Sequence, residues 1–259
     1  MIRFRSLGSG SGGNATVVEA SSGITTTRLL VDAGFSVREL EARLARASLA
    51  VSDLDAIFVT HEHGDHIGCA VTLSARYQLP LWMSRGTWRA IGEPAPPPGL
   101  RFARDDEPVA VGDLELIPFT VAHDAAEPLQ LRCSDGGAHV VVLTDLGSIT
   151  THMLERVAGC SALLLECNHD AALLAASRYP PSLKARIGGR LGHLSNATAA
   201  EILAHCLGPR LRHVVAAHLS RENNHPDIVR AALAATWSGD GREVVVAHPV
   251  RGFDWLDAG

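Results

Sequence analysis

Residues 61–66 constrain this chain more than any other part of its sequence. They carry three imidazoles and two carboxylates, and they follow directly on the apolar residues 56–59, which predict a buried strand. Burying so many polar groups at the end of a core strand is costly unless something binds them. A divalent cation is the usual compensation, because imidazole and carboxylate are common metal ligands. The run therefore predicts a metal site.

The spacing within this run favours two cations over one. In an extended turn His61 and His63 project to the same side, while Asp65 and His66 can reach a neighbouring position. Two ions about 3.5–4 Å apart lower the pKa of a shared water and neutralise charge on a phosphoryl group. The run thus predicts a hydrolase in which a hydroxide bridges two divalent metal ions.

Short β-branched runs alternate with helical patterns along the chain. Strands are expected at residues 15–19, 28–31, 56–60, 114–120, 129–133, 139–144, 163–166, 213–217 and 243–247. Helices are expected at residues 37–47, 67–77, 150–157, 171–177, 197–207 and 226–236. The β-dense stretches on the two sides of the proline-rich loop 94–98 suggest two facing sheets covered by helices, an α/β fold. No linker divides the 259 residues, so we expect one domain, 1–259.

One motif of the chain resembles the signature of the metallo-β-lactamase superfamily: His61-x-His63-x-Asp65-His66. The resemblance implies a four-layered αββα sandwich with two metals at one edge of the sheets. It also implies further ligands downstream, and candidates stand at the ends of two predicted strands. On this basis His123 completes the imidazole set of one metal, and Asp145 bridges the two ions.

The last third of the chain resembles the RNase Z branch of this superfamily. Two stretches carry the likeness, residues 192–196 before a predicted helix and residues 218–224 after a predicted strand. The resemblance implies that His218 is the last metal ligand and that His193 is a catalytic acid or an electrostatic stabiliser. Asp65 is expected to ligate one ion and also to orient the nucleophile.

A closer likeness is to the YycJ (WalJ) group of bacterial proteins. It extends over motifs spread along the chain, namely residues 8–14, 166–170, 179–184, 192–196 and 221–224. The group is associated with nuclease activity, including 5′-to-3′ exonuclease action on DNA, so the resemblance implies a phosphodiesterase with nucleic acid as its substrate. Side chains of these motifs near the site are expected to contact the substrate: Asn14, Asn168, His169, Ser195 and Asn196.

Residues 178–190 carry positive charge without an acidic residue, in a chain whose formal net charge is -5. The basic residues of this segment are Arg178, Lys184, Arg186 and Arg190. Charge alone favours a solvated loop. Because the segment stands immediately before His193, we expect Lys184, Arg186 and Arg190 to hold phosphates that flank the scissile bond.

Two other function classes stay open at this point. The same site would serve a small-molecule hydrolase acting on a cyclic phosphodiester, ester, thioester or lactam, since one fold hosts many chemistries. The other class is a metal-stabilised binding module without turnover, which needs fewer ligands than are present. The nitrogen and carboxylate ligands admit Zn²⁺, Mn²⁺ or Fe.

The cysteines and the N-terminus bear on the compartment. Five cysteines form an odd set without a CxxC pair, and no apolar signal region follows Met1. No stretch approaches the ~18 apolar residues of a membrane span. We expect a soluble, cytoplasmic protein with free thiols and no membrane partner. The sequence assigns no oligomeric state, and His225 is expected only to open the helix before Pro226.

Overall fold

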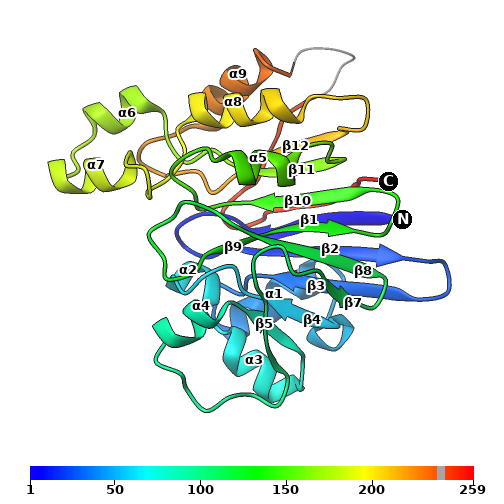
Figure 1. Ribbon diagram of the computed structural model, residues 1–259. Coiled ribbons are helices and arrows are strands. Elements are labelled where there is room, and N and C mark those ends of the chain that lie inside the picture. The colour runs from blue at the N-terminus through cyan, green and yellow to red at the C-terminus, as the bar shows by residue number, and fades with distance from the viewer. Residues whose placement is uncertain (238–242) are drawn as a thin grey trace.

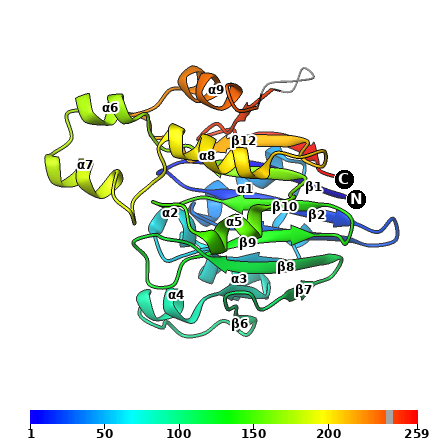
Figure 2. The ribbon, with the colours of Figure 1, turned by 45° about the horizontal axis from the view of Figure 1, so that its top comes forward.

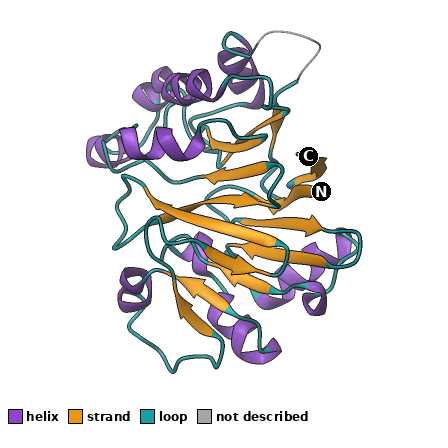
Figure 3. Cartoon of the chain, turned by 45° about the vertical axis from the view of Figure 1, so that its right-hand side comes forward, coloured by secondary structure: helices purple, strands orange, loops and turns teal. Residues whose placement is uncertain are grey.

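The computed structural model describes residues 1–237 and 243–259, in which two seven-stranded sheets face each other. In spatial order the first sheet contains β14 (Phe253–Asp257), β1 (Ile2–Gly8), β2 (Ala15–Ser21), β3 (Thr26–Val31), β4 (Ala56–Phe58), β5 (Leu81–Met83) and β6 (Leu100–Phe102). The second contains β13 (Val245–Val246), β12 (His213–Ala217), β11 (Ala162–Glu166), β10 (His139–Leu143), β9 (Leu129–Ser134), β8 (Leu114–Thr120) and β7 (Val109–Val111). Figure 3 shows these strands in orange, with the helices in purple outside them.

Helices cover the outer face of each sheet, which makes four layers (Figure 1). On the side of the first sheet lie α1 (Val37–Arg46), the 3₁₀ helix η1 (Val51–Asp53), α2 (Gly64–Ile67), α3 (Ala70–Tyr77) and α4 (Arg85–Ala90). On the side of the second lie α5 (Thr151–Val157), α6 (Ala171–Ala176), α7 (Pro181–Ile187), α8 (Asn196–Cys206) and α9 (Pro226–Ala234). The expected αββα sandwich is confirmed. None of the described helices is long and apolar enough to cross a membrane.

Strand β10 illustrates how the sequence builds these layers. Val140 and Val142 belong to the apolar core between the sheets, whereas Val141 and Leu143 belong to the core beneath α5 and α8. Successive side chains of a strand point to opposite faces. A strand that is covered on both faces therefore has a continuous run of apolar residues, as residues 140–143 do.

Several elements differ from those expected. The helix expected over 67–77 is broken at Gly68, whose backbone is left-handed at φ 33°, so that α2 and α3 are separate. Strand β1 precedes the glycine-rich loop, and the guanidinium groups of its Arg3 and Arg5 lie over the ring of Trp255. Strands β6 and β14 follow the proline-rich loop in sequence and yet belong to the first sheet.

The carboxyl ends of several strands meet at one edge of the sandwich. Strands β10, β11 and β12 are parallel to one another. Strand β8 runs in the same direction, because β8 and β10 each pair antiparallel with β9. Figures 1 and 2 show α2, α6 and α7 at this edge, on the left, while both chain termini lie on the right. Loops that leave these strands are therefore brought together far from the termini.

Candidate metal centre

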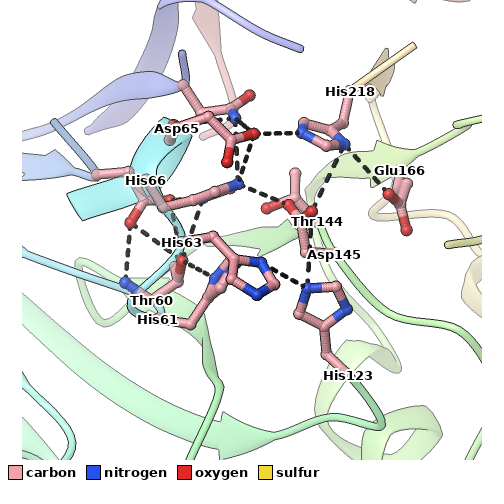
Figure 4. Close-up of polar contacts among 12 residues, drawn as sticks. Thr60, His61, His63, Asp65, His66, His123, Thr144, Asp145, Glu166 and His218 are labelled. Carbon is pink, nitrogen blue, oxygen red and sulfur yellow. Dashed lines mark hydrogen bonds and ion pairs between the residues drawn. The ribbon is translucent and has the colours of Figure 1, made fainter. Parts of the chain in front are cut away.

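All seven predicted metal ligands lie beyond the carboxyl end of a strand. They are His61, His63, Asp65 and His66 after β4, His123 after β8, Asp145 after β10, and His218 after β12. Figure 4 shows these side chains gathered around Asp145. Asp145 and His218 have left-handed backbones, with φ of 56° and 54°. Such backbones cost about 1–2 kcal/mol per residue and persist where the surroundings hold them, often at functional sites.

Three imidazoles form a first group. The Nε2 atom of His61 lies 3.0 Å from Nδ1 of His63, and Nε2 of His123 lies 3.3 Å from the same Nδ1 atom. The other nitrogen of His123, Nδ1, is 3.1 Å from the carbonyl oxygen of Gly192 and donates to it, which leaves a lone pair on Nε2 of the neutral ring. Three ring nitrogens that converge in this way suit a shared cation.

A second group joins Asp65, His66 and His218. The Oδ2 atom of Asp65 is 3.3 Å from Nε2 of His218 and 3.7 Å from Nε2 of His66. The ligand atoms of this group lie within 4.8 Å of one another, as do those of the first group. The sandwich edge thus carries two adjacent sets of nitrogen and oxygen donors.

Asp145 stands between the two groups. Its Oδ2 atom is 2.9 Å from Nε2 of His66, and its Oδ1 atom is 4.0 Å from Nε2 of His123. Oδ2 is fully buried and makes no aligned hydrogen bond with any described residue, although the His66 ring is so close. A buried carboxylate oxygen without a donor is costly. A cation between these atoms satisfies it, so the residues fit a divalent metal.

The electrostatics of the centre also favour a bound divalent cation. Burial lowers the pKa of His61 well below its ordinary value, so this ring is neutral and able to donate a lone pair. Burial also opposes a charge on His66 and His218, but Asp145 and its neighbouring carboxylates raise the pKa of His66 well above its usual range and that of His218 to about 10. The carboxylates thus draw positive charge to these positions, where a metal ion competes with protons.

Two buried carboxylates outside the predicted ligand set hold the imidazoles in place. Asp32 accepts from Nδ1 of His66 at 2.8 Å. Glu166 Oε1 accepts from Nδ1 of His193 at 2.7 Å and lies 3.3 Å from Nδ1 of His218. Such partners fix the tautomer and orientation of a ligating ring. Each stands where a predicted apolar strand ends in a carboxylate, a signal like the one that identified Asp145.

His193 lies beside the centre on its open side. Its side chain is 24% exposed, and its Nδ1 atom is 3.5 Å from Oδ1 of Asp145. Burial lowers the pKa of His193, but the carboxylate of Glu166 outweighs this and raises it above the ordinary value. Since Nδ1 is turned to Glu166, the Nε2 atom is the one left to act on another group. His63 and Asp65 are the other partly exposed side chains here.

Asn14, which is expected to contact the substrate, is engaged within the fold. Its side chain is buried, and its Oδ1 atom accepts from the backbone N–H of Gly10 at 2.8 Å. Its Nδ2 atom lies 3.2 Å from the carbonyl oxygen of Asp65 and 3.1 Å from Nε2 of His66. The amide therefore ties the glycine-rich loop 8–13 to the metal-binding loop and has no free face for a phosphate.

The other polar residues expected to touch substrate also serve the loops. Asn168 donates to the backbone oxygen of His218 at 3.1 Å, and Ser195 caps α8 by accepting from the N–H of Thr198. Asn196 exchanges hydrogen bonds with the side chain of Asn224. Asn168, His169 and Asn196 are buried. These side chains are either covered or already paired within the fold, and their expected contacts with substrate stay predictions.

The basic segment is a helical projection rather than the solvated loop that charge alone favoured. It contains α7, none of whose residues is buried, and Figure 2 shows α6 and α7 standing out from the sandwich. Lys184 donates to the backbone oxygen of Ala175, and Arg186 pairs with Asp124 at 2.7 Å. Asp124 in turn lies 3.5 Å from Nε2 of His123. Arg190 is exposed, so the segment offers positive charge close to the first group.

The Asn14→Ala variant is expected to weaken metal binding and stability more than substrate affinity. Removing the amide leaves its buried hydrogen-bond partners unsatisfied, which lowers the free energy of unfolding by about 1–3 kcal/mol. For a chain of this size that corresponds to a Tm lower by roughly 2–12 °C. Calorimetry and elemental analysis of the purified variant measure both effects. A variant with normal Tm and metal content but a raised KM would restore the substrate role.

The chain is similar to known proteins in both sequence and structure. The family described as "Beta-lactamase superfamily domain" matches residues 27–218, which include every predicted metal ligand. The exodeoxyribonuclease YycJ of Bacillus anthracis is 34% identical over 257 residues, covering 98% of this chain and 96% of that protein.

Two solved structures resemble the fold over nearly its whole length. The metallo-β-lactamase fold protein YhfI of Bacillus subtilis has a TM-score of 0.73 at 19% identity and covers 99% of this chain and all of that one. The short form of human tRNase Z has a TM-score of 0.65 at 16% identity and covers 99% of each chain. Likeness at this level of identity extends to the fold alone.

Proposed function

Because this chain belongs to the metallo-β-lactamase superfamily, a hydrolytic family, we propose that it is a metal-dependent exodeoxyribonuclease acting from the 5′ end of a strand. The observation that carries the proposal is the convergence of seven ligand side chains from four strand ends on two adjacent sites. The similarity to a protein named as an exodeoxyribonuclease over almost the whole chain supports the substrate class.

We assign one ion to His61, His63 and His123, and a second to Asp65, His66 and His218, with Asp145 between them. Divalent ions in such a pair supply a Lewis acid for the phosphoryl group. The nitrogen and oxygen donors suit Zn²⁺ or Mn²⁺, and Fe also fits. Asp32 and Glu166 position the rings and are not counted as ligands.

We assign to His193 the role of stabilising the leaving oxygen. Its ring is held by the carboxylate of Glu166, which favours the protonated form. A cationic imidazole at the open side of the centre stabilises negative charge that develops on the departing oxygen, and it can deliver a proton there. Asp65, also on the open side, is placed to orient the nucleophile.

We propose that nucleic acid approaches along the α6 and α7 projection. Exposed arginines there are suited to phosphates, which attract guanidinium groups irrespective of base sequence. Arg186 reaches the centre through Asp124, and Arg190 stands close to Gly192, the partner of His123. The projection thus leads to the first metal group.

Arg190→Ala is expected to weaken oligonucleotide binding and to reduce the slope of log affinity against log salt by about one, since one phosphate contact is lost. Filter binding with labelled single strands at several salt concentrations measures the slope. Arg212→Ala is the matched control, because Arg212 is exposed and precedes β12 at its opposite end from His218. If the two variants show the same slope as the wild type, the projection is not the path of the strand.

Oligonucleotides labelled at the 5′ or the 3′ end test the proposed reaction itself. A 5′-to-3′ exonuclease releases the 5′ label at once as a very short product, whereas the 3′-labelled strand shortens progressively. The opposite pattern would reverse the polarity. Brisk hydrolysis of a small ester without any cleavage of oligonucleotide would favour a small-molecule hydrolase.

We further propose that residues 1–259 form one domain. The apolar core between the sheets contains Ile2 and Phe4 from the beginning of the chain and Phe253 and Ala258 from its end. Because residues from both ends of the chain pack into the same core, the core supports one domain that folds as a single cooperative unit.

We propose the cytoplasm as the compartment. All five cysteines are buried free thiols, which suits a reducing environment.

A further inference from the structure

A cleft of about 570 Å³ opens next to the last metal ligand. Its walls come from the loop after β12, the first turn of α9 and the turn between β13 and β14. The side chains that give it its character are Leu219, Arg221, His225, Arg230, His248 and Arg251. The volume falls in the range of small-ligand pockets, about 300–1,000 Å³.

The charge of the cleft is positive, unlike that of the whole chain. Three arginines line it, and none of its lining residues, all of them in the described part of the chain, is acidic. Arg230 is paired with Asp227 at 3.2 Å on the rim. Arg221 lies against the glycine-rich loop, where a Cβ on Gly12 would stand 3.2 Å from its Nη2 atom. The cleft therefore presents guanidinium groups to whatever enters it.

The two histidines add hydrogen-bond donors of fixed direction. Nδ1 of His248 accepts from the backbone N–H groups of Val250 and Arg251, at 3.0 and 3.2 Å. Nδ1 of His225 accepts from the N–H of Asp227 at 3.3 Å. A neutral ring that accepts at Nδ1 carries its proton on Nε2. Both rings thus have a donor at Nε2, and the donors of the cleft match an anion rich in acceptor oxygens.

The cleft adjoins the second metal group. Leu219, on its wall, directly follows His218, whose backbone N–H donates to Oγ of Ser9 at 2.9 Å. A Cβ on Gly10 would lie 3.6 Å from the carbonyl oxygen of Leu219 and 3.9 Å from Cβ of Pro249. The glycine-rich loop therefore contacts both the backbone of His218 and the wall of the cleft, and its small residues allow this close approach.

The cleft and the α6 and α7 projection flank the centre. Arg186 of the projection reaches His123, in the first metal group, through Asp124. Arg221 of the cleft follows His218, in the second group. A strand that enters along the projection and crosses both groups arrives at the cleft, which has room for about one nucleotide.

We propose that this cleft binds the 5′-terminal nucleotide of the strand through its terminal phosphate, an inference that rests on the proposed exonuclease function. Arg221 and Arg251 hold the phosphate together with the Nε2–H groups of His225 and His248. The cleft then determines both which end is attacked and how short the released product is. The site is one of end recognition and takes no part in breaking the bond.

Two otherwise identical oligonucleotides, one with a 5′-phosphate and one with a 5′-hydroxyl, test the proposal on the metal-loaded protein. The wild type should degrade the phosphorylated strand with a KM lower by roughly tenfold or more, as expected for charge-assisted hydrogen bonds. The Arg221→Ala/Arg251→Ala double variant should lose this preference, and Arg212→Ala should retain it. If the wild type degrades both strands equally, or prefers a 3′-phosphate, the cleft assignment is overturned. Either result leaves the proposed nuclease function intact.

A binding measurement separates this proposal from the nuclease function. Calorimetric titration of the metal-loaded protein with thymidine 5′-monophosphate should give an affinity that falls roughly tenfold or more in the double variant. Thymidine, which lacks the phosphate, should bind both proteins equally weakly. Equal affinity of wild type and double variant for the monophosphate overturns the proposal whether or not the protein degrades DNA. Absence of DNA cleavage together with the expected binding difference would instead count against the nuclease alone.

Discussion

Replacing Asp145 with asparagine is expected to remove most of the bound metal and to slow DNA hydrolysis by roughly a thousandfold or more. Asp145 is buried between the two groups, and its Oδ2 atom is left without an aligned donor among the described residues. Loss of its charge weakens both proposed metal sites together. The Lewis acidity of the ions stabilises the transition state by several kcal/mol. Since about 1.4 kcal/mol corresponds to a factor of ten in rate, losing the ions costs several factors of ten.

Elemental analysis after reconstitution and initial rates on a labelled strand measure these two effects. Asparagine keeps the volume of the side chain, so the variant tests the charge rather than a cavity. Asp254→Asn is the matched control, because Asp254 is 87% exposed and pairs with Arg5 on β1. Metal content that is the same in Asp145→Asn as in the wild type would contradict the bridging role.

His193→Ala is expected to keep its metal and to lose about 10²–10⁴ in kcat, the usual contribution of a positioned general acid. The reason is geometric: the ring lies beside Asp145, yet its Nδ1 atom is engaged by Glu166 and its Nε2 atom is left for the substrate. The comparison of kcat with metal content separates this role from that of a ligand.

The control for His193 is His205→Ala, an exposed imidazole near the end of α8. His218→Ala provides the contrast, since it should lose metal as well as activity. The roles of His193 and His218 would have to be exchanged if His193→Ala lost metal while His218→Ala retained it.

The candidate metal-binding motif was predictable because its information is local. His61, His63, Asp65 and His66 stand within six residues after an apolar strand, and the resemblance to a known signature supplied the candidates downstream. Strands β8 and β12 were predicted with their observed limits, since each is made mostly of neighbouring apolar residues. These features depend on residues next to one another in the chain.

Features that depend on distant partners were not predictable. Glu166 is 27 residues from His193, and Asp32 is 34 residues from His66, so only the folded chain reveals that each carboxylate positions a ring. Trp255, which covers the arginines of β1, comes from the other end of the chain.

Asn14 illustrates a different limit. A polar side chain in a glycine-rich loop near a metal motif is as compatible with a substrate contact as with an internal one. Its hydrogen bonds to Gly10 and to the backbone of Asp65 give it an internal role, and they are visible only when the loops are placed side by side. The same holds for Ser195, whose hydroxyl caps α8.

The most direct test of the central claim is a titration of metal-depleted protein with Mn²⁺ or Zn²⁺, followed by the rate of nucleotide release from a 5′-phosphorylated DNA strand. A dinuclear exonuclease predicts no release without metal and a rate that reaches its plateau at two equivalents per chain. Nucleotide release that persists in the metal-depleted protein, or no release at any equivalence of either ion, would contradict the account.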